Sequence, residues 1–254
     1  MNVAIVEGRP SRGWNGRVHR ARARLGHSHL TDQRAMQLRP DVRRALADHW
    51  RGLGEVLHSS FVAYQDLARR LAMLDAPSEL VHRSIVAAEQ AGHNGAQCFE
   101  LAGRYLGRSM RQGRLRRPLR LPRSRQSELC AMALESLLDG VLLEGYAARM
   151  ASARAARATD ARAADALTVL AADSLSRAAL SLDVLTWLVE VGGDPVAAVV
   201  RHTALGLPDH APRLLVPTHL NAHVLADHGL FDADPEGAVF ATLADAVRSA
   251  HGRP

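Results

Sequence analysis

Pairs of side chains spaced four residues apart on predicted helices are the first features of this sequence that could do chemistry. Glu89 and His93 have this spacing, as do His219 and His223, with His228 close behind. Residues i and i+4 lie on one face of a helix, which is a usable spacing for metal ligands. For the C-terminal histidines, a position on the surface is the simpler interpretation.

A cysteine beside histidines suggests a second kind of chemistry. Cys98 could act as a nucleophile with His93 or His58 as its base, or it could simply be a small core residue. Both Cys98 and Cys130 fall inside helical patterns, which favours reduced thiols in a cytoplasmic protein. The sequence contains no glycine-rich phosphate loop, no nucleophile elbow and no Cys-x-x-Cys motif.

Composition narrows the class of protein. The 254 residues are 47% hydrophobic but only 4% aromatic, which is typical of closely packed helices and argues against a protein that stacks nucleic-acid bases. The net charge is +6 and every one of the basic residues is arginine, a habit of GC-rich bacterial genomes. No apolar run approaches the roughly 20 residues that span a bilayer, so we expect no membrane insertion.

Long helices are the elements that must position these side chains. Apolar residues recur with helical spacing, and Pro77, Gly107 and Asp160 mark helix ends or starts. The pattern predicts four long helices, with Ser78 and Asp160 as N-caps, and three shorter ones. They cover about 41–76, 78–106, 126–157, 160–192, 194–205, 218–229 and 234 onward, and Thr218 is the expected cap of the sixth.

The same pattern divides the chain. Residues 1–39 form a basic arm without helical periodicity, 40–206 the helical bundle, and 207–254 a C-terminal helical extension packed on that bundle. Within the bundle, 107–125 is an arginine-rich connection between two helical hairpins. One long crossover of this kind is found in ferritin-like folds.

From about residue 41 to its end, the chain resembles bacterial ferritin-like domain proteins. The resemblance rests on one short segment in each long helix and on one segment near the C-terminus. These segments are Leu57-His58-Ser59-Ser60, Cys98-Phe99, Gly140-Val141-Leu142-Leu143-Glu144, Ala172-Asp173-Ser174-Leu175-Ser176-Arg177 and Asp227-His228-Gly229-Leu230. The resemblance implies an all-α, ferritin-like four-helix bundle with a long crossover and additional short C-terminal helices.

The resemblance also implies where a di-metal centre would lie. Such a centre takes carboxylates from the helices and two Glu-x-x-His pairs. The matching positions here are Leu57, Ala91, Asn94, Glu144, Ser174 and Arg177. Only Glu144 keeps a ligand, so we expect a degenerate site that holds no metal and needs no cofactor.

Arg177 is the most informative of these replacements. It stands where the family has a metal-binding histidine, so the resemblance implies that it points inward. A guanidinium there could replace the positive charge of the metal and pair with Glu144. Alternatively, Arg177 turns to solvent and Glu144 is protonated or hydrated.

A rival hypothesis keeps one metal ion in a shifted position. His58, His93, Glu144 and Asp173 lie close to the lost ligand positions and could form a mononuclear site. One residue along a helix turns a side chain by about 100°, so these groups would have to lean inward from flanking faces.

Three functions remain open. The first is metal-independent acid–base chemistry on a small molecule in the bundle cavity, such as a cyclisation, isomerisation or hydrolysis in a biosynthetic pathway. The second is a non-catalytic scaffold or partner subunit, and the third is a metal-dependent oxidoreductase with rearranged ligands. A homodimer also remains open. The candidate catalytic residues are Glu144, Arg177, His58, Tyr64, Asn94, His93 and Asp173.

Overall fold

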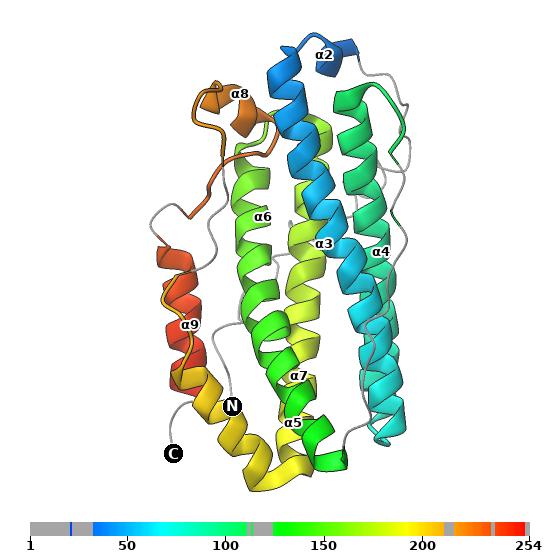
Figure 1. Ribbon diagram of the computed structural model, residues 1–254, viewed down its shortest axis with the longest axis vertical. Coiled ribbons are helices and arrows are strands. Elements are labelled where there is room, and N and C mark those ends of the chain that lie inside the picture. The colour runs from blue at the N-terminus through cyan, green and yellow to red at the C-terminus, as the bar shows by residue number, and fades with distance from the viewer. Residues whose placement is uncertain are drawn as a thin grey trace.

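The computed structural model is all-helical over the residues that it describes. These residues are 21, 33–110, 113, 124–210, 216–234 and 237–251, and among them there is no strand. The longest helices run side by side along the long axis of the molecule (Figure 1). This confirms the predicted all-α class. None of the helices in this part of the chain is long and apolar enough to cross a membrane. Most of the predicted arm at 1–39 and most of the connection at 107–125 lie outside the described residues.

The first two long helices form a hairpin that follows a short helix, α2 (Gln33–Met36). Helix α3 (Pro40–Met73) begins with a proline in its first turn, where the missing N–H would have no helical partner. Helix α4 (Ser78–Leu106) ends at Gly107 as predicted, with the left-handed φ of 66° that glycine adopts easily. The predicted N-cap was one residue off, because Pro77 occupies the cap position and Ser78 is the first helical residue.

The third long stretch is not the uninterrupted α-helix that its sequence predicts. It consists of α5 (Arg125–Glu135), the π-helix η1 (Ser136–Glu144) and α6 (Gly145–Arg157). A π-helix is wound so that residues i and i+5 are hydrogen-bonded neighbours, and such segments are rare and frequent at functional sites. Glu144, one of the candidate catalytic residues, is the last residue of η1.

Helix α7 (Ala161–Leu205) begins as predicted, because the Asp160 carboxylate accepts a hydrogen bond of 2.9 Å from the Ala163 N–H. Gly193, with φ of 61° and ψ of −154°, breaks the helical geometry just before Pro195. The predicted boundary at Gly192-Gly193 therefore corresponds to a kink, and the ribbon changes direction there (Figure 1).

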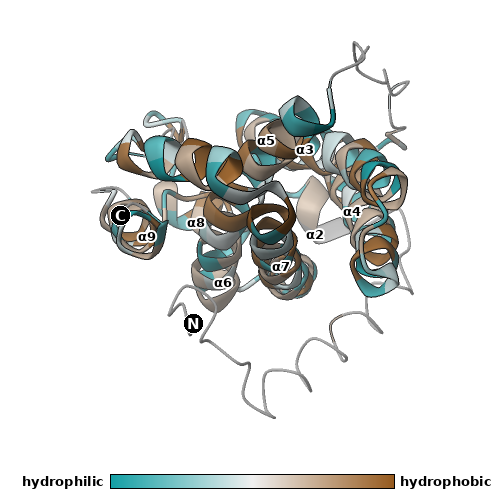
Figure 2. Cartoon of the chain, turned by 90° about the horizontal axis from the view of Figure 1, so that it is seen from below, coloured by the Kyte–Doolittle hydropathy of each residue, from teal (hydrophilic) through white to brown (hydrophobic). Residues whose placement is uncertain are grey.

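Two short helices follow. Helix α8 (Ala222–Asp227) is capped by Asn221, whose side chain accepts from His223 N and Val224 N, so the prediction of Thr218 as the cap was wrong. Helix α9 (Ala238–His251) contacts α6 and α7 and lies on the outer side of α6 (Figure 2).

Two clusters of buried apolar residues make up the core, and a polar layer separates them along the helices. On α7 one cluster reaches Ala171 and the other starts at Leu180. On α3 the corresponding limits are Leu57 and Tyr64. The polar residues of α7 between these limits are thus enclosed above and below by apolar side chains.

Gly140 allows η1 to approach α7 closely. A Cβ added to Gly140 would lie 2.1 Å from Ser181 Oγ and 2.2 Å from Ser181 Cβ. A Cβ added to Gly145, five residues further, would meet nothing within 4 Å. A side chain at Gly140 would therefore clash with α7, whereas one at Gly145 would not, although both residues are helical.

We predict that Gly140→Ala lowers the free energy of unfolding by about 1–3 kcal/mol, because the two helices must move apart. Gly145→Ala is the matched control and should raise it by about 0.5–1 kcal/mol, because alanine favours helix over glycine. Urea denaturation measures both. Equal effects of the two substitutions would contradict the close approach of η1 and α7.

Candidate functional site

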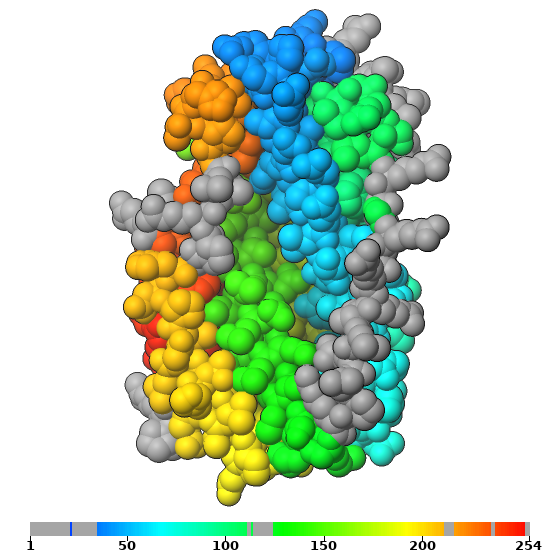
Figure 3. All heavy atoms as spheres, in the orientation of Figure 1, coloured from blue at the N-terminus to red at the C-terminus, as the bar shows by residue number. Residues whose placement is uncertain are grey.

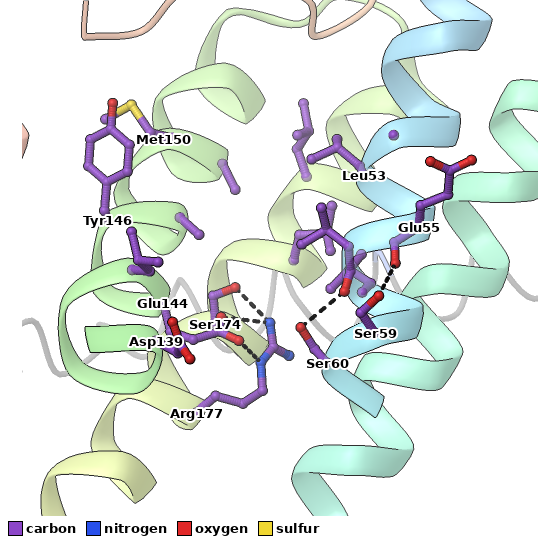
Figure 4. A pocket seen from close by; sticks show the side chains of 18 of the residues that line it. Leu53, Glu55, Ser59, Ser60, Asp139, Glu144, Tyr146, Met150, Ser174 and Arg177 are labelled. Atoms are coloured by element: carbon purple, nitrogen blue, oxygen red, sulfur yellow. Dashed lines mark hydrogen bonds and ion pairs between the residues drawn. The ribbon is translucent and has the colours of Figure 1, made fainter. Parts of the chain in front are cut away.

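A buried ion pair lies at the centre of the polar layer. Arg177 on α7 donates from Nε to Glu144 Oε1 at 2.7 Å and from Nη2 to Glu144 Oε2 at 2.9 Å. Nη2 also donates to Ser174 Oγ at 2.8 Å, one turn earlier on α7 (Figure 4). The Arg177 side chain is only 1% exposed, whereas that of Glu144 is 12% exposed. The predicted inward orientation of Arg177 and its pairing with Glu144 are confirmed.

The surroundings keep Arg177 charged. Burial lowers the pKa of the guanidinium, but the Glu144 carboxylate and, more weakly, Tyr64 and Asp173 outweigh burial, so the pKa is raised overall. Tyr64 on α3 places its hydroxyl 3.5 Å from Glu144 Oε1, a long hydrogen bond. Burial, followed by the charge of Glu144, raises the pKa of Tyr64, so this phenol remains a proton-bearing group.

A second polar pair lies beside the first. Asn94 on α4 donates from Nδ2 to Asp173 Oδ2 at 2.9 Å, and both residues are buried. Asn94 Oδ1 is buried and has no hydrogen-bond partner among the described residues. Asn94 and Asp173 thus lie in the same polar layer as the ion pair, but neither of them lines the two cavities described below.

The two candidate histidines lie elsewhere. His58 Nε2 is 3.2 Å from the carbonyl oxygen of Gly113, and His93 is exposed with Nε2 2.8 Å from Gln97 Nε2. Neither lines the central cavity described below. Within the described ranges, no group of three or more His, Cys, Asp or Glu side chains is placed to hold a metal ion. The structure therefore does not assemble the shifted mononuclear site, because His93 projects outward rather than leaning toward Glu144.

Cys98 and the C-terminal histidines also have structural explanations. Burial raises the pKa of the Cys98 thiol to about 12, so it stays protonated and unreactive in the core. His219 and His223 are both exposed, as their interpretation as surface residues predicts.

A cavity of about 900 Å³ opens above the ion pair. It lies between α3 on one side and η1 and α6 on the other, with α7 behind, and the surface is hollowed between α3 and α6 (Figure 3). This volume is in the range of small-molecule sites. Its larger apolar residues are Leu53, Val56, Leu57, Leu143, Met150, Leu167 and Leu170. Its buried polar end consists of Glu144, Ser174 and Arg177.

A smaller cavity of about 250 Å³ adjoins the first. The two share Ser60, Ala63, Asp139 and Glu144 in their walls. Tyr64 lines only the smaller one. Asp139 and Glu144 therefore stand where the two spaces meet, opposite Ser60 of α3 (Figure 4).

Asp139 is the polar residue that sequence reasoning missed. In an α-helix, residues five apart point about 140° away from each other. The π-helical winding of η1 instead stacks Asp139 and Glu144 on one face, since i and i+5 are neighbours in that geometry. Partial burial, and then the charge of Glu135, raises the pKa of Asp139. Nothing in the apolar periodicity of the sequence signals the π-helix.

No family model, curated protein or solved structure matches this chain. The site must therefore be interpreted from its own geometry.

We predict that Arg177→Met lowers the free energy of unfolding by about 3–5 kcal/mol, because it leaves the Glu144 carboxylate buried without its cation. The double change Glu144→Leu with Arg177→Met should be more stable than the single change, because no uncompensated charge remains. Thermal melts of the three proteins decide this. A single variant that melts like the wild type would rule out a stabilising ion pair.

We predict that Asp139→Asn raises the melting temperature at pH 7. The raised pKa means that folding favours the protonated carboxyl, so ionisation of Asp139 disfavours the folded state as pH rises. The gain should vanish below the ordinary aspartate pKa of 3.8, where the carboxyl is protonated in both states. Glu100→Gln, at an exposed position of α4 outside both cavities, is the control. A gain that is independent of pH, or shared by the control, would contradict this account.

Proposed function

We propose that the chain is a ferritin-like four-helix bundle that has lost its di-metal site and uses its central cavity for metal-independent acid–base chemistry on a small molecule. The pairing of α3 with α4, and of α5, η1 and α6 with α7, supports this arrangement. The observation that carries the functional proposal is the cavity of about 900 Å³ that ends on the pair of Glu144 and Arg177.

Glu144 is the proton acceptor in this proposal. Its carboxylate is bound by Arg177 on one side and keeps access to the cavity on the other, as its 12% exposure shows. A carboxylate in a largely apolar site is surrounded by little water, which strengthens its interactions with a bound substrate. Arg177 supplies the fixed positive charge that pairs with the carboxylate inside the molecule.

Asp139 is the matching proton donor. Partial burial and the charge of Glu135 raise the pKa of Asp139 above the ordinary aspartate value, whereas Glu144 accepts two hydrogen bonds from the Arg177 guanidinium. Two neighbouring carboxyl groups in different surroundings are a recurring arrangement for acid and base roles. Because both line the same wall, one could remove a proton and the other return one, as a cyclisation, isomerisation or hydrolysis requires.

A non-catalytic scaffold, the alternative function, would be expected to have a filled core rather than an open cavity. A scaffold gains stability from filling its core, and unfilled volume of this kind is unfavourable. The open cavity therefore favours ligand binding. The metal-dependent alternative lacks a convergent ligand group in the described part of the chain.

A base in an apolar cavity can be tested without the natural substrate. 5-Nitrobenzisoxazole opens when a base removes its C3 proton and its N–O bond breaks, and the phenolate product absorbs visible light. We predict catalysis by the wild type that falls about 100-fold or more in Glu144→Gln, since a positioned base contributes at least that much.

Ala147→Trp and Ala153→Trp form the matched control pair for that assay. Both alanines are exposed on α6, but only Ala147 lines the cavity. The change at Ala147 should abolish catalysis by filling the mouth of the cavity, and the change at Ala153 should leave it intact. Wild-type catalysis no faster than that of Glu144→Gln would refute the acid–base proposal.

A further inference from the structure

One nitrogen of the Arg177 guanidinium has no partner. Nε and Nη2 are engaged by Glu144 and Ser174, whereas Nη1 is buried and makes no hydrogen bond within the described part of the chain. Figure 4 shows this nitrogen on the side of the guanidinium away from Glu144, toward Ser60 on α3. Both Arg177 and Ser60 line the larger cavity. A buried donor without an acceptor is uncommon and unfavourable, so Nη1 marks a place where a ligand oxygen would be stabilised.

The charges around Nη1 decide what kind of oxygen fits. The charge of Arg177 is already balanced by Glu144. Asp173 acts on the guanidinium from α4's side of the layer, and Asp139 stands in the cavity wall beside Glu144. A carboxylate or phosphate ligand would therefore add a negative charge to an end of the cavity that already has an excess of carboxyl groups. Arg154, the other arginine in the lining, lies ten residues beyond Glu144 along α6 and donates to the Phe231 carbonyl oxygen, so it does not offset this excess next to Nη1. An ammonium group would be tolerated by those carboxyl groups but has no acceptor to offer Nη1.

The wall next to the polar end favours an apolar and extended body for the rest of the ligand. From Leu167 to Arg177, the lining of the cavity follows α7 for ten residues, which is about 15 Å at the helical rise of 1.5 Å per residue. Leu167, Leu170 and Leu57 form the wall next to the polar end. These side chains offer no hydrogen bonds, so they would contact a hydrocarbon chain or ring system.

We propose that the cavity takes an uncharged carbonyl compound with an extended apolar body, whose carbonyl oxygen accepts a hydrogen bond from Arg177 Nη1. This inference names the ligand class of the function proposed above and rests on it. Arg177 acts here as a binding residue as well as the partner of Glu144. The same placement brings the carbons next to the carbonyl close to the end of the cavity that contains Glu144.

Three compounds with nine carbons and different head groups test this inference: 2-nonanone, nonanoate and nonylamine. The affinity of each compound is measured by its displacement of a neutral fluorescent probe, N-phenyl-1-naphthylamine, from the wild-type protein at pH 7. We expect 2-nonanone to bind at least about ten-fold more tightly than either charged compound, which is the scale of one hydrogen bond to a charged donor. Tighter binding of nonanoate or nonylamine would overturn the inference.

The variant Arg177→Lys tests whether Nη1 is the nitrogen that binds the carbonyl oxygen. Lysine keeps a positive charge for Glu144 but lacks the third nitrogen, so the preference for 2-nonanone should fall about ten-fold while the affinity for the fluorescent probe is retained. If that preference survives in a folded Arg177→Lys protein, the carbonyl does not bind at Nη1, and the inference fails. Arg149→Lys, at an exposed residue of α6 outside both cavities, is the matched control and should keep the preference.

The outcomes separate the two proposals. A protein that catalyses the opening of 5-nitrobenzisoxazole but prefers a charged nonyl compound retains the proposed function and loses the ligand class. A protein that binds neither the fluorescent probe nor any of the three compounds has no usable cavity, and both proposals fall. Binding of 2-nonanone without any catalysis would leave the ligand class standing and refute the acid–base role of Glu144.

Discussion

The ion pair between Glu144 and Arg177 is the interaction around which the centre of this molecule is arranged. Two opposite charges taken out of water are stable only if their geometry is good and the remaining hydrogen-bonding groups are satisfied. The bidentate contact meets the first condition, and Ser174 meets part of the second. The polar layer then divides the apolar core into two clusters, each of which can pack tightly on its own side.

The shape of η1 links this ion pair to the cavity. Gly140 lets η1 lie against Ser181 of α7, and the π-helical winding then brings both Asp139 and Glu144 to the inner wall. Helix α3 packs along α4, α6 packs along α7, and the two pairs meet where α4 packs against α7, so the space between α3 and α6 is left open. The cavity follows from this division of contacts, and its polar end follows from the ion pair.

Much of the architecture could be predicted from the sequence, because helix ends carry local chemical signals. Asp160 and Gly107 act through contacts within a few residues, so their roles could be predicted. The inward direction of Arg177 could be predicted only through a resemblance to ferritin-like proteins, because no local pattern in the sequence specifies its contact with Glu144.

The functional details were harder to predict, because they depend on small rotations about helix axes. His93 is one residue away from a position that resemblance marks as inward, and that single step turns it to the surface. Asp139 was missed for the opposite reason, because a local change of winding turned it inward. The volume of the cavity depends on how far α3 stands from α6, which no local pattern encodes.

The π-helix also determines how this chain responds to a change of length. Residues i and i+5 are hydrogen-bonded neighbours in η1, whereas i and i+4 are in the α-helices on either side, so a π-helical turn holds one residue more than an α-helical turn. Loss of one codon between Ser136 and Glu144 would be absorbed when one such turn returns to α-helical winding, and α6 would keep nearly the same rotation relative to α5. The same loss within α5 has no wide turn to absorb it and would rotate α5 and α6 by about 100° relative to each other. The segment that carries Asp139 and Glu144 is therefore also the one in which evolution can change the length of this helix with the least disturbance.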